Sequence, residues 1–205
     1  MTRLSTDPGA GFADPVLASQ SVFRGVMDAL ARPGTIQILP THVAVAGPGA
    51  MSPGVAALVL ALADHDTPVW LDPMLAANKD AANWLRFHTG APLVDNMAQC
   101  VFALIGDGRS MPPLEQFALG SDEYPDRSAT LIVQVDTLTD GPPLVLSGPG
   151  IRGTAICRAG GLPANIAEQL AANRTLFPRG IDLVLVCGTQ LISIPRSTRV
   201  VTQGA

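Results

Sequence analysis

The residues that could do chemistry gather in one short stretch, LALADHDTPVWLDP. Behind an apolar run it carries three carboxylates and an imidazole: Asp64, His65, Asp66 and Asp72. A metal-dependent hydrolase uses this mixture of residues, and His88 could supply a second imidazole. However, neither H-x-H nor H-E-x-x-H spacing occurs, and the sequence has only three histidines. Three interpretations are open: a structural turn, a contact with a ligand or partner, and a catalytic metal site.

The elements around this stretch favour the turn. Ser52-Pro53 opens the run GVAALVLALA, which is apolar all round and predicts a central, buried helix. If this helix ends near Ala63, Asp64 and Asp66 lie at its carboxyl end, where the helix dipole disfavours carboxylates. Aspartate side chains readily accept hydrogen bonds from nearby backbone N–H groups in turns. We therefore predict a helix-to-strand turn, at which Asp64 and Asp66 remain candidate contacts of a ligand or partner.

The further candidate contacts of a ligand or partner are arginines and one histidine. Arg86 and His88, in LRFHTGAP, fall in the last turn of a predicted helix, where the dipole favours cations, but the planar fork of Arg86 could also bind an anion. Arg196 follows a predicted strand, and Arg24 and Arg32 bracket the first predicted helix. Several arginines would suit a phosphate-bearing ligand, although the compositional bias of the chain explains the ratio of arginine to lysine equally well.

Other motifs argue against cofactors. Lys79, the only lysine, lies in a polar stretch that we expect to be exposed, so we predict no covalently bound pyridoxal phosphate. GPGIRG matches G-x-G-x-x-G, but no amphipathic helix follows it, and a tight turn between strands is the better interpretation. Cys100 and Cys187 lie on apolar runs and are interpreted as packing thiols. We predict no catalytic residue, no metal ion and no cofactor.

The composition points to a protein that shares its surface with others. Charged residues make up 15% of the 205 residues, against about 25% in typical soluble proteins. Contact with further subunits would cover the apolar surface that so few charges leave exposed. The net charge of −4 argues against binding to nucleic acid. The first residues have no signal-peptide pattern and no apolar run is long enough to span a membrane, so we expect a soluble, cytoplasmic protein.

Helical and strand patterns alternate along the chain. Asp14-Pro15 opens a helix that ends by Arg32, with Val22, Phe23, Val26, Met27 and Leu30 as its expected apolar face. GIDLVLVCG and QLISIPRS predict a hairpin at the end of the chain. We predict an α/β fold: a single three-layer domain over residues 15–205, with a mixed β-sheet flanked by helices, preceded by a flexible arm over residues 1–14.

Five stretches together resemble the PhnH family of the bacterial carbon–phosphorus (C–P) lyase system for phosphonate degradation: FRGVMDALARPG, LADHDTPVWL, LRFHTGAPLV, LVLSGPGI and FPRGIDLVLVCGTQLISIPRST. They run in order from residue 22 to residue 198. The resemblance implies a fold like that of pyridoxal-phosphate-dependent transferases without the cofactor. It also implies homodimers and a core complex with PhnG, PhnI and PhnJ, with PhnL as a functional partner. No catalytic residue is carried over from the family.

Two hypotheses follow. In the first, the chain is a subunit, not catalytic alone, of the transferase complex that couples ATP-derived ribose triphosphate to an alkylphosphonate before a lyase cuts the C–P bond. In the second, it is an independent metal-dependent phosphotransferase or hydrolase that uses Asp64, Asp66 and His88. The low charge and the absence of a complete catalytic constellation in the sequence favour the first.

Overall fold

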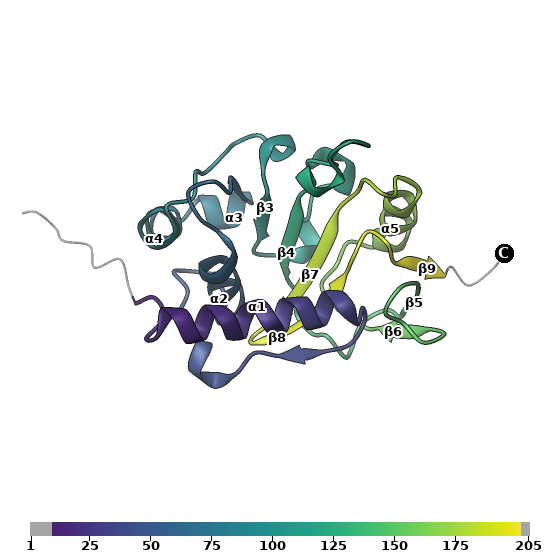
Figure 1. Ribbon diagram of the computed structural model, residues 1–205, viewed down its shortest axis with the longest axis horizontal. Helices are drawn as coiled ribbons and strands as arrows, with labels where there is room; N and C mark the ends of the chain where they lie inside the picture. Colours follow the sequence, from purple (N-terminus) through teal and green to yellow (C-terminus); the bar gives the residue numbers. More distant parts are fainter. Residues whose placement is uncertain (1–9, 202–205) are drawn as a thin grey trace, which may run out of the picture.

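A six-stranded mixed sheet lies at the centre of the computed structural model, which describes residues 10–201 (Figure 1). The strand order is β1-β8-β7-β4-β3-β2. Four strands are parallel to one another: β2 (Val69–Leu71), β3 (Phe102–Ile105), β4 (Thr130–Gln134) and β7 (Asp182–Cys187). The strand β8 (Gln190–Ile194) forms the predicted hairpin with β7, and β1 (Gln37–Ile38) pairs antiparallel with β8.

The central strands are buried on both faces, which explains why their sequences are nearly continuous runs of Val, Ile and Leu. In β4, Leu131, Ile132 and Val133 are all fully buried. Ile132 packs into one hydrophobic core, whereas Leu131 and Val133 pack into a second core on the opposite face. The sheet therefore separates two cores, each of which must be covered by other elements.

Helices cover the first face. They are α1 (Pro15–Ala31), α2 (Pro53–Leu62), α3 (Pro73–Ala76) and α4 (Lys79–Thr89). The carboxylate of Asp14 caps α1 by accepting a hydrogen bond from the Leu17 backbone N–H at 3.1 Å, and the helix ends just before Arg32, as predicted. The residues from Gly54 to Val59 in α2 are buried, which confirms a central apolar helix. Gly90 ends α4 in the left-handed conformation.

The second face is covered by α5 (Ile166–Thr175), by a three-stranded antiparallel sheet and by short 3₁₀ turns. The small sheet has the order β6-β5-β9, with β5 (Leu144–Ser147), β6 (Ala155–Cys157) and β9 (Arg199–Val201). These 3₁₀ turns are η2 (Met97–Gln99), η3 (Gly108–Ser110), η4 (Leu114–Gln116) and η5 (Pro125–Arg127). A further 3₁₀ turn, η1 (Thr41–Val43), lies on the first face, where Val43 packs into the first core. The structure is thus a mixed α/β fold with helices, as predicted, and GPGIRG connects β5 to β6.

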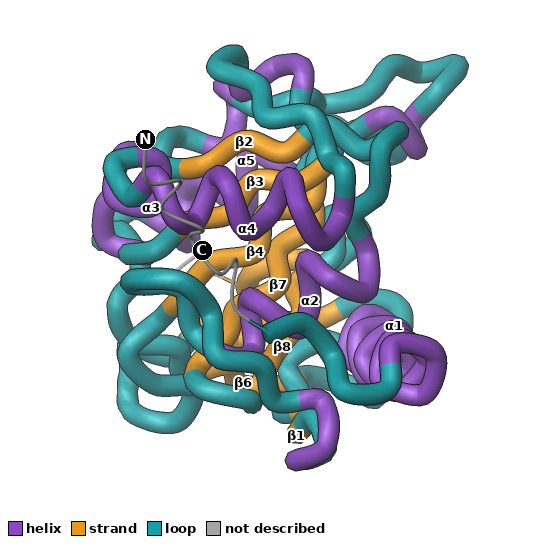
Figure 2. Tube along the Cα trace, turned by 90° about the vertical axis from the view of Figure 1, so that its left-hand side faces the viewer, coloured by secondary structure: helices purple, strands orange, loops and turns teal. Residues whose placement is uncertain are grey.

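One expected core face is partly wrong. Val22 and Val26 of α1 are buried, but Phe23 and Met27 are about half exposed, at 52% and 49%. The two pairs lie on adjacent stripes of the same helix, and only one stripe can face the sheet. Figure 2 shows α1 end-on at the margin of the molecule, in agreement with the exposure of Phe23 and Met27.

Local patterns in the sequence also predict a short helix over PPLEQFALGS and one helix over LAANKDAANWLRFHTG, and the structure changes both expectations. The helix expected in PPLEQFALGS is only the 3₁₀ turn η4. The stretch LAANKDAANWLRFHTG contains the end of α3 and all of α4, because Asn78 breaks the helix and caps α4. No helix among residues 10–201 is long and apolar enough to cross a membrane. The division into an arm (1–14) and one domain (15–205) stays a prediction, and residues 1–9 and 202–205 lie outside the described residues.

Candidate functional site

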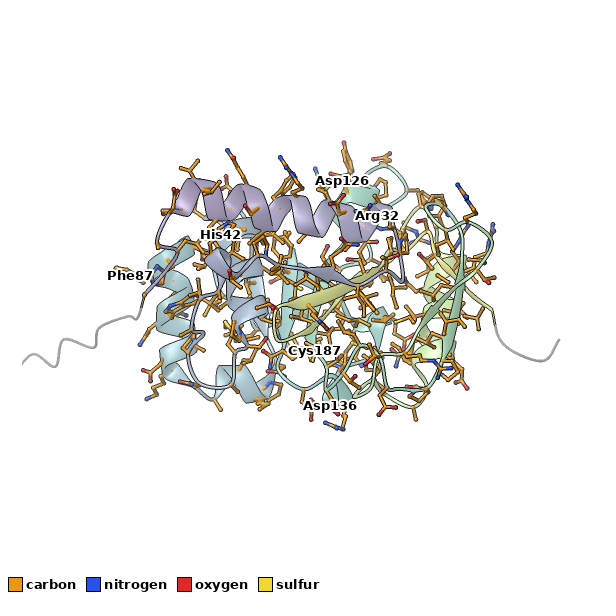
Figure 3. All side chains as sticks on the ribbon, turned by 90° about the horizontal axis from the view of Figure 1, so that it is seen from below. Arg32, His42, Phe87, Asp126, Asp136 and Cys187 are labelled. Carbon is orange, nitrogen blue, oxygen red and sulfur yellow. The ribbon has the colours of Figure 1, made fainter. Side chains whose placement is uncertain are left out.

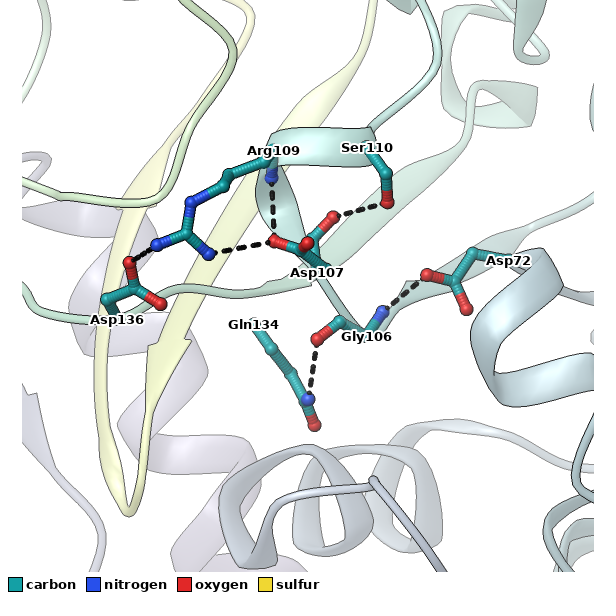
Figure 4. A network of polar contacts seen from close by, with 7 residues as sticks. All are labelled: Asp72, Gly106, Asp107, Arg109, Ser110, Gln134 and Asp136. Atoms are coloured by element: carbon teal, nitrogen blue, oxygen red, sulfur yellow. Dashed lines mark hydrogen bonds and ion pairs between the residues drawn. The ribbon is translucent and has the colours of Figure 1, made fainter.

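Polar side chains follow the carboxyl ends of the parallel strands, at one edge of the central sheet (Figure 4). Asp72 follows β2, Asp107 follows β3, and Asp136 lies two residues after Gln134, the last residue of β4. In open α/β sheets, ligands bind outside the carboxyl ends of the strands. We call this group, together with Arg109, the carboxyl-edge network.

The inner part of the network is structural. Asp72 is 1% exposed, and its carboxylate accepts hydrogen bonds from the backbone N–H groups of Leu75 and Gly106, each at 2.8 Å. It therefore caps α3 and joins the ends of β2 and β3. The Gln134 amide donates to the carbonyl of Gly106 at 2.9 Å and accepts from the Ser52 backbone N–H at 2.6 Å, which ties the start of α2 to the same edge.

The outer part is open to solvent and charged. The guanidinium of Arg109 contacts the Asp107 carboxylate at 3.4 Å and forms an ion pair with Asp136. More than half of the Arg109 and Asp136 side chains is exposed. The thiol of Cys187 donates to the backbone carbonyl of Asp136 at 3.3 Å, and Figure 3 shows both residues on one side of the molecule. The planar fork of N–H donors of an arginine is suited to bidentate binding of carboxylates and phosphates.

The cysteines differ in accessibility. Burial raises the pKa of the Cys100 thiol to about 11 and also raises the pKa of the Cys157 thiol. The thiolate is the reactive form, so both groups are protonated and unreactive near neutral pH. Cys187 is only partly buried, so the prediction of an inert packing thiol fits Cys100 better than Cys187.

Thiol labelling checks this difference. At about pH 8 we expect Ellman's reagent to modify Cys187 alone in the folded protein and all three cysteines after denaturation. Because the pKa of Cys100 is raised, its labelling should begin only as the pH approaches about 11. A Cys187→Ser variant that still reacts with one equivalent at the lower pH would contradict the assignment.

The stretch that opened the sequence analysis is a turn. The Asp64 carboxylate accepts a hydrogen bond from the Asp66 backbone N–H at 2.9 Å, and the Thr67 hydroxyl donates to the Asp64 carbonyl at the same distance. Asp66 is exposed and forms an ion pair with His65 at 3.3 Å, with both side chains about 80% in solvent. These contacts offset the unfavourable position of the carboxylates at the end of α2, as the turn interpretation requires.

His88 does not join these carboxylates in a metal site. It lies in the last turn of α4, with its ring centroid 4.9 Å from Trp84 and 5.0 Å from Phe87. A Cβ atom on Gly11 would lie 3.0 Å from its Nδ1 atom, so the chain before α1 covers one side of the ring. Among residues 10–201, no three His, Cys, Asp or Glu side chains are arranged to hold a metal ion. The interpretation of Asp64, Asp66 and His88 as a metal-dependent active site is therefore not supported.

The candidate arginines are dispersed. Arg24 and Arg86 are exposed on different helices, and Arg32 forms an ion pair with Asp28 at 3.0 Å at the end of α1. Arg196 differs from these three in burial, because its side chain is only 17% exposed. Whether any of them contacts a ligand or partner stays a prediction.

Arg196 is bound within the fold. Its Nε atom donates to both oxygens of the Asp182 carboxylate, at 3.2 and 3.1 Å, and Nη2 donates to Oδ2 at 2.5 Å. Nη1 donates to the carbonyl of Pro125. The pair joins the start of β7, the end of β8 and the turn η5. Its donors are occupied by protein acceptors, so a structural role accounts for them.

A separate cavity of about 590 Å³ lies between η4 and α5. Leu114, Glu115, Glu168 and Thr175 are among its lining residues, and none of the candidate residues predicted from sequence lines it. Its lining contains two glutamates and no cationic side chain, so it offers a phosphonate no group of opposite charge.

Sequence reasoning missed the outer part of the carboxyl-edge network. Asp107, Arg109 and Asp136 come from two loops whose residues lie up to 29 positions apart, so no short motif contains them. The available signal was positional: GDGRS follows the apolar run FALI, and VDT follows TLIVQ. Polar residues directly after buried strands mark the edge at which α/β proteins bind ligands.

Comparison with known proteins gives concordant matches. A sequence model of the family described as "Bacterial phosphonate metabolism protein (PhnH)" matches residues 10–201. The "Alpha-D-ribose 1-methylphosphonate 5-triphosphate synthase subunit PhnH" of Rhizobium meliloti (strain 1021) is 46% identical over 199 residues, which cover 97% of this chain and 98% of the relative. The "Putative C-P lyase subunit protein HtxG" of Stutzerimonas stutzeri is 28% identical over 186 residues, 91% of this chain and 87% of the relative.

Proposed function

This chain belongs to the PhnH family of bacterial phosphonate metabolism proteins, and from that membership we propose that it is a subunit of an alpha-D-ribose 1-methylphosphonate 5-triphosphate synthase in the C–P lyase system. One observation carries the proposal: 46% identity to a synthase subunit over nearly the full length of both chains. The substrate side of the reaction is then a methylphosphonate or a similar alkylphosphonate.

The proposed subunit has no catalytic activity of its own. The residues that an independent hydrolase would use have other tasks in the fold. Asp64 accepts a hydrogen bond within its turn, and the ring of His88 lies against Trp84 and Phe87. Arg196 pairs with Asp182. These contacts support a chain that completes a shared site over a chain that runs a reaction alone.

Within the proposal, the carboxyl-edge network is where the chain meets a phosphate-bearing ligand. Arg109 offers a planar fork of donors, which matches the oxygens of phosphates and phosphonates. Asp107 and Asp136 hold the guanidinium at the edge of the sheet while leaving more than half of its side chain exposed. Such a ligand would replace one of the two carboxylates on the guanidinium.

The proposal also names partner subunits and a related fold. We propose PhnG, PhnI and PhnJ as the other core subunits, PhnL as a functional partner, and a cytoplasmic assembly. The kinship to pyridoxal-phosphate-dependent transferases is also proposed, without a covalent cofactor, because Lys79 is exposed and its amine lies in water.

We also propose a homodimer that forms through the outer stripe of α1, which we define as Val16, Phe23 and Met27. These side chains are 69%, 52% and 49% exposed on one side of a 17-residue helix. A two-fold interface uses the same patch on both copies, so an exposed apolar stripe on one helix can pair with itself. Such a contact also explains how a chain with 15% charged residues covers its apolar surface.

A reconstituted synthase reaction tests the proposed function. Purified PhnG, PhnI and PhnL are mixed with ATP and methylphosphonate, with and without this chain, and the phosphonate product is followed by ³¹P nuclear magnetic resonance. We expect product only when the chain is present, and none from the chain alone, because it completes a shared site.

A further inference from the structure

Charge is distributed unequally along this acidic protein. Residues 1–140 carry 15 acidic and 7 basic side chains, whereas residues 141–205 carry 2 acidic and 6 basic ones. The last third of the chain is therefore cationic, although the whole chain has a net charge of −4. Such an asymmetry indicates a surface that interacts with molecules of the opposite charge.

Half of the arginines in this cationic segment already have partners. Arg196 pairs with Asp182, Arg179 lies 3.1 Å from a carboxylate oxygen of Asp122, and Arg174 lies over the ring of Phe177. The other half are Arg152, Arg158 and Arg199. All three are exposed, and none has an ion pair or hydrogen bond to the side chains of residues 10–201.

One of the three unpaired arginines, Arg199, lies on the small sheet, and the other two lie next to its strands in the chain. Ser147 lies opposite Arg199 in the pairing of β5 with β9, and Val145 lies opposite Ile156 in the pairing of β5 with β6. Side chains alternate between the faces of a strand, so these four residues share one face. Leu144, Leu146 and Cys157 are buried on the other face, against the second core.

The shared face is the outer one, and the remaining arginines adjoin it. Arg158 lies two residues after Ile156, which returns it to the same side, and Arg152 lies in the turn between β5 and β6. Ile156 is 57% exposed. Figure 1 shows β5, β6 and β9 together at one end of the molecule, beyond the central sheet. We call this surface the basic sheet face.

We propose that the basic sheet face docks on an acidic surface of another subunit of the synthase assembly. The inference rests on the proposed function, since it requires such an assembly. The basic sheet face has an exposed isoleucine with arginines near it. Protein interfaces have the same arrangement: an apolar centre, and a polar rim whose charges set the orientation of the partner. The three exposed arginines are free to pair with carboxylates of another molecule, so the proposed partner contributes aspartate or glutamate around an apolar contact.

A protein partner fits this face better than a small ligand or a nucleic acid. Arg199 lies on β9, Arg158 directly follows β6 and Arg152 lies in a turn, so the arginines are spread over an open sheet face. The cavity between η4 and α5 is lined by other residues. No aromatic side chain lies on β5, β6 or β9 to stack with bases. The acidic remainder of the chain would repel a polyanion that extended beyond the face.

Affinity capture tests the proposal. The tagged chain is co-expressed with PhnG, PhnI and PhnJ of the same organism, and the captured subunits are identified. The Kd between this chain and the captured subunits is then measured by biolayer interferometry. The double variant Arg158→Glu/Arg199→Glu should weaken binding at least about tenfold, because it places like charges against the partner. Raising the salt concentration from about 0.05 to about 0.5 M should weaken wild-type binding more than binding of the double variant.

Two controls make the test decisive. Lys79→Glu reverses an exposed charge on α4, far along the chain from the basic sheet face, and should leave Kd unchanged. Arg158→Lys/Arg199→Lys keeps the charge and should bind like the wild type, while the melting temperature of each variant shows that it is folded. Equal binding by the glutamate variant and the wild type would contradict the basic sheet face as the docking surface, and it would leave the proposed assembly intact. Wild-type protein that captures none of the three subunits would instead overturn the proposed assembly.

Discussion

Replacing Arg196 by methionine is expected to lower the free energy of unfolding by about 3 kcal/mol, which makes it one of the two largest effects we predict. The substitution removes every side-chain donor to the Asp182 carboxylate, which is only 17% exposed. The carboxylate keeps the hydrogen bond from the backbone N–H of residue 196, at 2.7 Å, but loses its opposite charge. A largely buried charge without an opposite charge is costly, even where the intact pair adds little net stability. The melting temperature should fall by roughly 6–12 °C in a domain of this size.

Two further variants separate this cause from lost packing. Asp182→Asn/Arg196→Met removes both charges and should recover part of the loss, so the two sites should show a clear coupling energy in a double-mutant cycle. Arg24→Met removes an exposed arginine that has no ion-pair partner among residues 10–201, and its effect should stay within about 0.5 kcal/mol. An Arg196→Met protein that unfolds like the wild type would show that the pair does not hold β7, β8 and η5 together.

The second large effect concerns assembly. Phe23→Asp should convert the proposed homodimer into a monomer without unfolding it, because Phe23 is 52% exposed in the single chain. About half of the Phe23 side chain remains to be buried in the dimer, which contributes about 1 kcal/mol in each copy, so the dissociation constant should rise by at least roughly thirtyfold. Size-exclusion chromatography with light scattering gives the mass directly.

Phe87→Asp is the matched control for this experiment. Phe87 is 68% exposed on α4, outside the outer stripe of α1, and its replacement should leave the mass at that of the dimer. A monomeric wild-type protein, or a Phe23→Asp protein that remains dimeric, would contradict the assignment of the outer stripe as the interface.

Much of the fold follows from local sequence patterns. Asp14-Pro15 marks the start of α1 and Gly90 the end of α4, because caps depend on the chemistry of one or two residues. The helix α2 and the final hairpin were also predicted, because an apolar run and a short turn between two strand patterns are local features of the sequence. In contrast, the 3₁₀ turn η4 depends on tertiary contacts that local preferences do not encode.

The orientation of α1 could not be predicted from the sequence pattern. Val22 and Val26 form one apolar stripe, and Phe23 and Met27 form the next, so the periodicity permits either stripe to face the sheet. Packing against the sheet selected the smaller side chains and left the larger ones outside. The low charge content had indicated such an uncovered surface but could not locate it.

The candidate site was harder to predict than the fold. Asp64 was correctly interpreted as a turn residue, because its partners lie within three positions. Arg196 was considered a contact for a ligand, yet its partner Asp182 lies on the neighbouring strand of the hairpin. Arg109 and Asp136 meet only because β3 and β4 are parallel neighbours. Pairs of this kind require the strand order, which a single sequence does not give.

The synthase reaction measured with and without this chain tests the central claim most directly. If the chain is a subunit, PhnG, PhnI and PhnL should form the ribose triphosphate adduct of methylphosphonate only after the chain is added. The chain alone should form none. Full synthesis in its absence, or turnover of ATP by the chain alone with a divalent metal ion, would contradict its assignment as a subunit that is not catalytic by itself.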